Sequence, residues 1–266
     1  MKIAFRIIFR AIIFILLTIL TQTGGVIYLL SLWLSKRWKY NFRFKTLLAF
    51  TALYFLFTFL IIPVLAPVFG REKVKQTDNI QPANYATRLF NRDYVKPELN
   101  KLLAAASTDL KSKGITITYL DANFPFIDRF PLLPHLSHND GKKIDLSLIY
   151  ENTKGEITSE QKSRSGYGSF EGPHGIETNK INDCLDSGYF QYDYPKYLTF
   201  GKINDDLHFS QKGTKELIEV ILKQKALDKL FLEPHLVQRL NLNNAKIRYH
   251  GCRAVRHDDH IHIQLR

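Results

Sequence analysis

The chain has 266 residues, 45% of them hydrophobic, and a formal net charge of +12 from 37 Lys and Arg against 25 Asp and Glu. This composition excludes a disordered chain, and the placement of the charge excludes a generic basic surface for nucleic acid. Residues 1–75 contain eleven bases and a single acid, Glu72, whereas the other 191 residues contain 26 bases and 24 acids. The basic excess therefore belongs to the N-terminal quarter, and the rest of the chain is nearly neutral.

Two long uncharged stretches occupy this N-terminal quarter, over residues 11–34 and 46–70. About 20 apolar residues cross the hydrocarbon core of a bilayer, so the stretches predict membrane spans at about 11–34 and 46–69. A cleaved signal peptide is the alternative for the first stretch, but a second stretch follows it without a convincing small-residue cleavage site. We expect residues 1–75 to form a retained membrane anchor and residues 76–96 to form a linker.

The segment that joins the two stretches, residues 35–45, contains five bases and no acid. The positive-inside rule places such a short basic loop in the cytoplasm, and two spans would then leave both termini outside. Lys2, Arg6 and Arg10 favour the opposite orientation, with the N-terminus inside. The excess of five bases over three favours a large domain outside the cytoplasm.

Residues 97–266 predict one α+β domain, a small antiparallel sheet with flanking helices, because short strands and helices interleave without a repeat. Apolar periodicity predicts helices at 97–113, 212–225 and 234–240. Alternating or β-branched stretches predict strands at 115–120, 143–150, 229–232, 246–249 and 260–265. The intervening stretch 151–209 is rich in Gly, Ser, Asn and Asp and is expected to form loops over a site.

All nine histidines lie beyond residue 130, and the last three belong to a polar run, His-Asp-Asp-His-Ile-His, at residues 257–262. In a strand, His260 and His262 share one face, and two imidazoles on one face are a frequent beginning of a metal site. The alternative is a solvated polar tail. Asp258 and Asp259 weaken that alternative, because carboxylates can orient imidazoles or act as a base.

A second polar run, Ser-His-Asn-Asp-Gly-Lys-Lys-Ile-Asp-Leu, occupies residues 137–146. Gly141 permits a tight turn between His138 and the expected strand that carries Asp145. One His and one Asp from this segment, with a His from the other run, give three zinc ligands and an open fourth position. This pattern is typical of a catalytic zinc, whereas a structural zinc more often has four protein ligands, usually including Cys.

The two runs together resemble the LAS zinc peptidases, through the pattern Ser137-His138-x-x-Gly141-x-x-x-Asp145 and His260-x-His262. That family includes D-alanyl-D-alanine carboxypeptidases, D-Ala-D-Ala dipeptidases and penicillin-insensitive murein endopeptidases. The ending at 257–262 and the Lys-Leu-Phe-Leu-Glu-Pro segment at 229–234 are most similar to the murein endopeptidase branch. The resemblance covers about residues 97–266 and leaves out the anchor. Lys143 departs from it, because an acidic or small residue is frequent there.

The resemblance implies that His138, Asp145 and His262 bind one Zn²⁺ ion. It also implies that His260 lies beside the metal, where it stabilises the tetrahedral intermediate or orients water.

Two residues are candidates for the catalytic base. Several branches of the family place a carboxylate three residues before the last His ligand, and Asp259 matches that spacing. His257 is the alternative base, from the endopeptidase branch. We favour Asp259 because of its proton affinity near a cation, and we interpret Asp258 as a solvated surface carboxylate.

Five further residues are weaker candidates for substrate contact. Asp121 ends the expected strand 115–120, where it either lines the cleft or caps a turn. Arg253 and Arg256 flank the second run and either bind a substrate carboxylate or are ordinary surface residues. His135 and His174 either touch substrate or are solvated loop residues.

Cys184 and Cys252 are the only cysteines. An even pair in an exported domain favours a disulfide, which would connect the loop region to the segment before the second run. Two free thiols in a reducing compartment, or Cys252 as a metal ligand, are the alternatives.

These features predict a membrane-anchored zinc metallopeptidase. The resemblance implies peptide bonds of peptidoglycan as the substrate and the bacterial inner membrane as the location, with the catalytic domain on its periplasmic side. The alternative is a zinc-containing cell-wall binding or sensory domain without turnover, and a third reading is a membrane-anchored structural protein with a His-rich tail. The presence of His257, Asp259 and His260 favours the enzyme, and no nucleic-acid partner is expected.

Overall fold

The structure is a computed structural model that describes residues 2–266. The chain divides into two compact units that alternate along the sequence. The first unit comprises Met1–Lys73, Ala86–Lys96 and Asn123–Gly141, and the second comprises Val74–Tyr85, Pro97–Ala122 and Lys142–Arg266.

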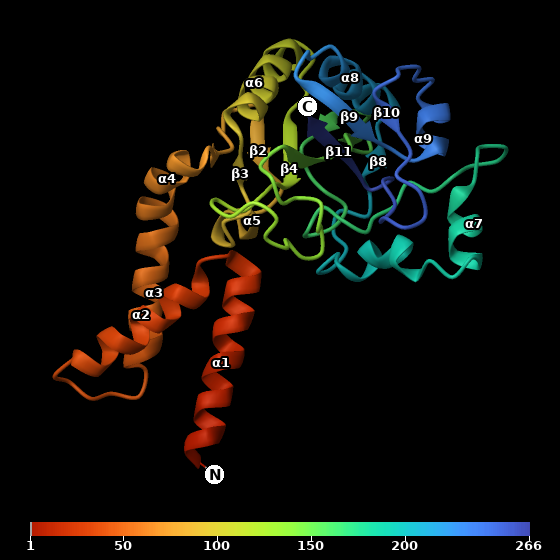
Figure 1. The fold of residues 1–266 in the computed structure, drawn as a ribbon. Coiled ribbons are helices and arrows are strands. Elements are labelled where there is room, and N and C mark those ends of the chain that lie inside the picture. Colours follow the sequence, from red (N-terminus) through yellow and green to blue (C-terminus); the bar gives the residue numbers. More distant parts are fainter. Residues whose placement is uncertain (1) are drawn as a thin grey trace. The chain divides into compact units, whose positions relative to one another are not determined.

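Helices dominate the first unit: α1 (Lys2–Thr21), α2 (Gly24–Arg37), α3 (Lys45–Leu56), η1 (Phe57–Ile61), α4 (Ile62–Leu65) and η2 (Ala66–Phe69) (Figure 1). The last four form one nearly continuous helix, in which η1 is a π-helical turn. Pro63 explains this wide turn, because proline has no N–H and its ring collides with the carbonyl four residues earlier in a regular α-helix. Two stretches, Ile3–Thr21 and Lys45–Phe69, are long and apolar enough to cross a membrane.

The first of these stretches differs from the span predicted at 11–34. The chain breaks at Gln22, whose φ is 64°, so the predicted segment is divided between α1 and α2. The second helix then turns back along the first. A Cβ on Gly25 would lie 2.0 Å from Oγ1 of Thr18, a contact that only glycine permits. The glycine pair that interrupts the apolar sequence is therefore the point of closest helix contact.

The stretch predicted as a linker contains regular structure. In the first unit it includes α5 (Ala86–Leu89) and β3 (Tyr94–Val95), and β3 pairs antiparallel with β1 (Glu72–Lys73). Tyr94 packs in a buried cluster with Ile62 and Ala66. The polar composition of this stretch concealed these short elements, whose positions depend on contacts with distant residues.

The second unit is built on a six-stranded sheet with the order β10-β9-β11-β5-β4-β2. Its strands are β2 (Ile80–Pro82), β4 (Ile117–Asp121), β5 (Lys143–Ser147), β9 (Leu227–Phe231), β10 (Ile247–Arg248) and β11 (His260–Leu265). The central strands are antiparallel, as predicted, but β10 runs parallel to β9 and β2 runs parallel to β4. The predicted α+β class is confirmed, but the sheet is mixed and not purely antiparallel.

The helices of the second unit that carry apolar stripes are α6 (Pro97–Lys111) and α8 (Gln211–Leu222), which lie against each other and along the sheet (Figure 1). The short helix α9 (Pro234–Arg239) begins at a proline in its first turn, as the sequence predicts. The stretch expected to form loops contains α7 (Lys180–Asp186), η3 (Phe190–Tyr197) and a small sheet of β6 (Tyr150–Glu151), β7 (Ile157–Thr158) and β8 (His208–Phe209).

Candidate metal centre

Two neighbouring strands hold three of the predicted site residues on one face of the six-stranded sheet. His262 on β11 is the cross-strand partner of Asp145 on β5, and Nδ1 of His262 lies 2.8 Å from Oδ1 of Asp145. His260 occupies the same face, with Nε2 3.8 Å from Oδ2 of Asp145. Ile261 and Ile263 alternate with them and are buried on the opposite face. The predicted strand alternation is the reason why these groups meet.

Two more polar residues of the second unit adjoin Asp145. The hydroxyl of Tyr167 donates to Oδ2 of Asp145 at 2.8 Å. Asp121, on β4, lies directly across the sheet from Asp145 and is buried. Asp121 is therefore the last residue of its strand and lies beside a predicted ligand, which agrees with a place in the lining of the cleft. Nothing in the sequence singled out Tyr167, since it lies in an irregular Gly- and Ser-rich stretch.

The loop that carries His138 also carries His135. Their ring centroids are 5.5 Å apart, and both side chains are buried. The metal-binding atoms of His135, His138 and Asp145 all lie within 4.8 Å of one another, so this buried group could hold a metal ion. His135 was expected to contact substrate or be a solvated loop residue, and its burial excludes the solvated alternative. The spacing His-x-x-His was the signal that could have identified it.

Asp259 uses both of its carboxylate oxygens. Oδ1 lies 2.5 Å from Nδ1 of His260, and Oδ2 accepts a hydrogen bond from the backbone N–H of Gly168 at 2.6 Å. Burial lowers the pKa of His260, but the carboxylates of Asp259 and Asp145 outweigh that effect and raise this pKa to about 9. In the metal-free chain, His260 therefore carries a proton and a positive charge at neutral pH.

His257, unlike His260, carries no positive charge at neutral pH. Burial, reinforced by the nearby imidazoles of His260 and His262, holds the pKa of His257 well below its usual range. Its ring centroid lies 4.8 Å from that of His260 and 5.8 Å from that of His262. Within residues 2–266, no group forms a hydrogen bond with its Nδ1. His257 is thus a neutral imidazole beside the candidate centre, with a proton affinity that burial lowers.

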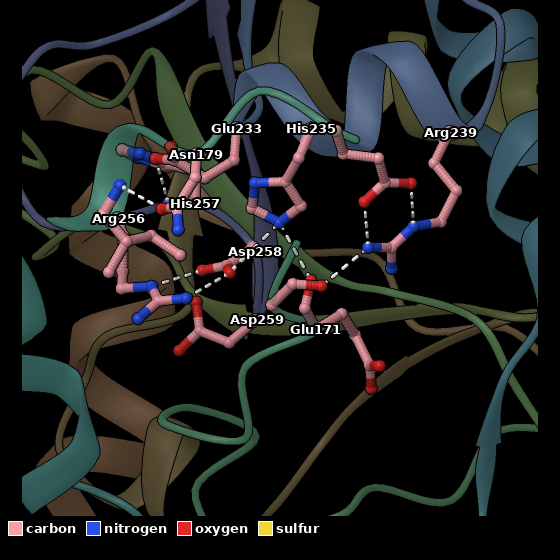
Figure 2. A network of polar contacts seen from close by, with 12 residues as sticks. Glu171, Asn179, Glu233, His235, Arg239, Arg256, His257, Asp258 and Asp259 are labelled. Atoms are coloured by element: carbon pink, nitrogen blue, oxygen red, sulfur yellow. Dashed lines mark hydrogen bonds and ion pairs between the residues drawn. The ribbon is translucent and has the colours of Figure 1, made fainter. Parts of the chain in front are cut away.

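A buried network fixes the start of the 257–262 run (Figure 2). The guanidinium of Arg256 donates to both oxygens of Asp258, at 2.7 and 2.5 Å. On the other side, Nε2 of His235 lies 3.3 Å from Oδ2 of Asp258. The interpretation of Asp258 as a solvated surface carboxylate is wrong, because this side chain is fully buried. Burial raises the pKa of Asp258, but hydrogen bonds to His235 and to the nearby Arg256 outweigh that effect and lower this pKa, so the carboxylate is ionised there.

The same network extends to Glu233 at the start of α9. One oxygen of Glu233 accepts from the backbone N–H of His257 at 3.0 Å, and the other accepts from the hydroxyl of Tyr192 at 2.6 Å. Figure 2 shows Glu233 next to His257 at the edge of this network. These bonds fix the backbone at His257, and so determine where its imidazole lies.

The two arginines predicted to bind substrate differ in their surroundings. Arg256 is buried, is hydrogen-bonded to Asp258 and lies 3.9 Å from the ring centroid of Phe170. Its charge is therefore paired inside the protein and is not accessible to a substrate. Arg253 is exposed and therefore accessible to a ligand. His174 is exposed as well.

Cys184 of α7 and Cys252 form a disulfide, with their Cα atoms 5.1 Å apart. The bond connects the loop-rich region to the segment that leads into the 257–262 run. It excludes the alternatives of free thiols and of Cys252 as a metal ligand.

No protein-family model matches the chain, and neither does any curated protein.

Proposed function

We propose that the chain is a membrane-anchored zinc peptidase that hydrolyses peptide bonds of peptidoglycan on the periplasmic side of the bacterial inner membrane. The observation that carries the proposal is the buried group of His135, His138 and Asp145, with His262 beside Asp145. Imidazole nitrogens and a carboxylate oxygen are ordinary zinc ligands, so the donor set fits this metal. The similarity of the motifs to LAS peptidases supports peptidoglycan as the substrate.

A bound zinc ion would supply Lewis-acid activation of a peptide carbonyl and of water. His138, Asp145 and His262 would hold it, with His135 as the alternative third donor in place of His262. His260 is directed by Asp259, and in its protonated form it can donate a hydrogen bond to the oxygen that becomes negative when the substrate carbonyl is attacked.

The proton acceptor is better assigned to His257 than to Asp259. Both oxygens of Asp259 are engaged, by His260 and by the backbone of Gly168, which suits a residue that orients its neighbour. His257 is neutral and adjoins the same group of side chains. General bases of this kind contribute about a hundredfold or more to rate.

The geometry of the first unit supports a periplasmic domain. Gln22, at the break after α1, accepts hydrogen bonds from the segment that starts at Asn123, and Phe69, at the end of η2, contacts Phe126 of that same segment. The break and the end of the second apolar stretch therefore lie together. The N-terminus and the basic loop 38–44 are then on the opposite side, so both basic regions favour the cytoplasm.

A purified full-length chain tests the proposal. We expect one zinc ion per chain by elemental analysis and cleavage of cross-linked muropeptides by chromatography. His138→Ala should lose both, and His174→Ala, at an exposed loop position, should lose neither. A wild-type chain without stoichiometric zinc would refute the proposal.

The engagement of Asp259 also gives some support to the second candidate, a zinc-containing cell-wall binding or sensory domain without turnover. Stoichiometric zinc and retention on peptidoglycan, without any cleavage product, would favour it. Unchanged biological activity of an Asp259→Ala, His257→Ala double variant would support the same conclusion.

A further inference from the structure

The loop that carries His135 and His138 belongs to the same compact unit as the apolar helices. That unit joins Met1–Lys73 to Asn123–Gly141, although 49 residues separate them in sequence. Two polar side chains of the helical region, Arg71 and Gln22, make the connection.

Arg71 follows directly after the second apolar stretch and is only 1% exposed. Its guanidinium donates to the backbone carbonyl of Phe124 and to the carboxylate of Asp128, and reaches the carbonyl of Asn139 at 3.4 Å. Phe124 and Asp128 lie where the loop begins, and Asn139 immediately follows His138. One side chain therefore closes the loop at both of its ends.

Gln22 makes the second connection. Its carbonyl oxygen accepts from the backbone N–H groups of Phe126, at 2.9 Å, and Ile127, at 3.4 Å. Its amide N–H donates to the carbonyl of Ile127 at 3.4 Å. The left-handed backbone at Gln22, which ends α1, is what presents this side chain to the loop. The ring of Phe69 adds an edge contact with Phe126, at 4.9 Å between centroids.

Glycine at position 141 lets the loop close on Arg71. Its φ is 78°, and a Cβ there would lie 3.0 Å from Nε of Arg71. The N–H of Gly141 donates to the side chain of Asn123 at 3.1 Å, and its carbonyl accepts from Lys96 at 2.8 Å. The buried guanidinium of Arg71 needs its carbonyl and carboxylate partners in the loop, because an unpaired charge in the interior is strongly unfavourable.

We propose that Arg71 and Gln22 are positioning residues for His135 and His138, so that the membrane anchor is a structural part of the metal centre. The inference rests on the proposed function, since it assigns these histidines to a metal. The anchor then does more than retain the protein at the membrane: its polar side chains hold the backbone of this loop at both ends.

The test compares full-length chains in lipid nanodiscs. Arg71→Met removes the guanidinium donors, Gln22→Leu removes the amide, and Arg71→Lys keeps the charge without the fork that reaches both loop ends. Ser35→Ala is the matched control, because it removes a 3.0 Å hydrogen bond to Thr46, between α2 and α3, that does not involve the loop. Hydrogen exchange of residues 124–139 is measured without zinc, and zinc affinity is measured by chelator competition.

We expect Arg71→Met and Gln22→Leu to accelerate exchange in 124–139 while amides of β5 and β11 keep their protection. Zinc affinity should fall about ten- to a hundredfold, the usual effect of losing a group that orients a metal ligand. Arg71→Lys should be intermediate and Ser35→Ala unchanged. If Arg71→Met does not fold, Gln22→Leu, which buries no charge, decides the question.

Two results would overturn distinct claims. Unchanged exchange in 124–139, or variants with wild-type zinc affinity, would refute the positioning role. A wild-type chain that binds no zinc would refute the proposed function, whatever the exchange shows.

Discussion

Nδ1 of His262 and Oδ1 of Asp145 lie 2.8 Å apart on adjacent strands, as directly paired residues of β11 and β5. Their separation is set by sheet register, because a slip of one residue would move His262 to the apolar face. Two of the proposed ligands are thus fixed by backbone hydrogen bonds, before any metal binds.

Removal of the metal should lower stability only when Asp145 is present. A ligand that binds the folded state at a hundred times its Kd adds about 3 kcal/mol to the free energy of unfolding. We therefore expect a chelator to lower the Tm of the wild type by several degrees and to leave the Tm of Asp145→Ala unchanged. Differential scanning fluorimetry with and without added zinc checks this. Equal chelator effects on both proteins would contradict the role of Asp145.

The assignment of the base can be tested by two isosteric variants. His257→Gln should lower kcat about a hundredfold or more with zinc still bound, because the proton acceptor is lost. Asp259→Asn should have a smaller effect, and it should lower the pKa of His260, which Asp259 raises. The kcat is followed on a cross-linked muropeptide, and the pKa by NMR of the zinc-free protein. A larger loss of kcat in Asp259→Asn would restore Asp259 as the base.

The buried pair of Asp258 and Arg256 should be important for stability. Asp258→Asn leaves the buried guanidinium with only the longer 3.3 Å contact to Asp193 as a counter-charge, so the cost approaches the about 3–5 kcal/mol of a broken buried pair. Asp183→Asn is the matched control, since its ion pair with Lys180 is exposed and is expected to contribute little to stability. Thermal unfolding of the two variants measures the difference. Equal Tm values would show that the buried pair contributes no more than a surface pair.

Asp93 should make stability depend on pH. Burial raises its pKa from 3.8 to about 6, against the opposing charges of Lys73 and Arg88. Because the folded state binds this proton more tightly than the unfolded chain does, the contribution of Asp93 to stability improves as pH falls from 7 through 6, and levels off below about 4. Asp93→Asn should raise the free energy of unfolding at pH 7 by about 3 kcal/mol and remove this dependence.

Unfolding of Asp93→Asn at pH 5 and pH 7 measures the effect. The exposed Asp78→Asn is its control, expected to behave as the wild type. A wild-type profile in Asp93→Asn would show that another group titrates.

The disulfide should stabilise the fold considerably. It closes a loop of 68 residues, for which chain entropy predicts about 4 kcal/mol. A Cys184→Ser, Cys252→Ser double variant should therefore have a clearly lower Tm, and reductant should lower the Tm of the wild type but not of that variant. Calorimetry in both conditions makes the comparison. A reductant effect on the double variant would point to another cause.

Much of the second unit follows from local sequence patterns. The apolar stripes predict α6 and α8 to within a few residues of their ends. Alternating or β-branched stretches predict β4, β5, β9 and β11. The shared face of His260 and His262 follows from the same rule. These elements are predictable because their patterns reflect burial of one face, which depends little on the details of packing.

The residues that sequence patterns missed depend on distant partners. The sequence suggests that Asp258 is solvated because it does not show that His235 of α9, 23 residues away, and Phe170 enclose the pair that Asp258 forms with Arg256. The interruption from Gln22 to Gly25 marks a weak point in the first apolar stretch, but the sequence does not reveal the bond of Gln22 to Phe126, more than 100 residues away. Likewise, Tyr167 reaches Asp145 only through a loop without periodicity. Polar pairing and loop geometry are tertiary properties.

The edge strand β2 has a practical consequence for any soluble form of the protein. Ile80–Pro82 pair in parallel with β4 and cover its outer side, yet they precede the helix at which the domain begins in sequence. A chain that starts at Pro97 would leave the β4 edge, with Ile117 and Tyr119, unpaired and prone to aggregation. Cleavage after folding, at residues 83–96, would leave β2 hydrogen-bonded to β4 and still covalently joined to the preceding apolar helices. The cut domain should therefore stay bound to the anchor, whereas a chain that starts at Pro97 should aggregate.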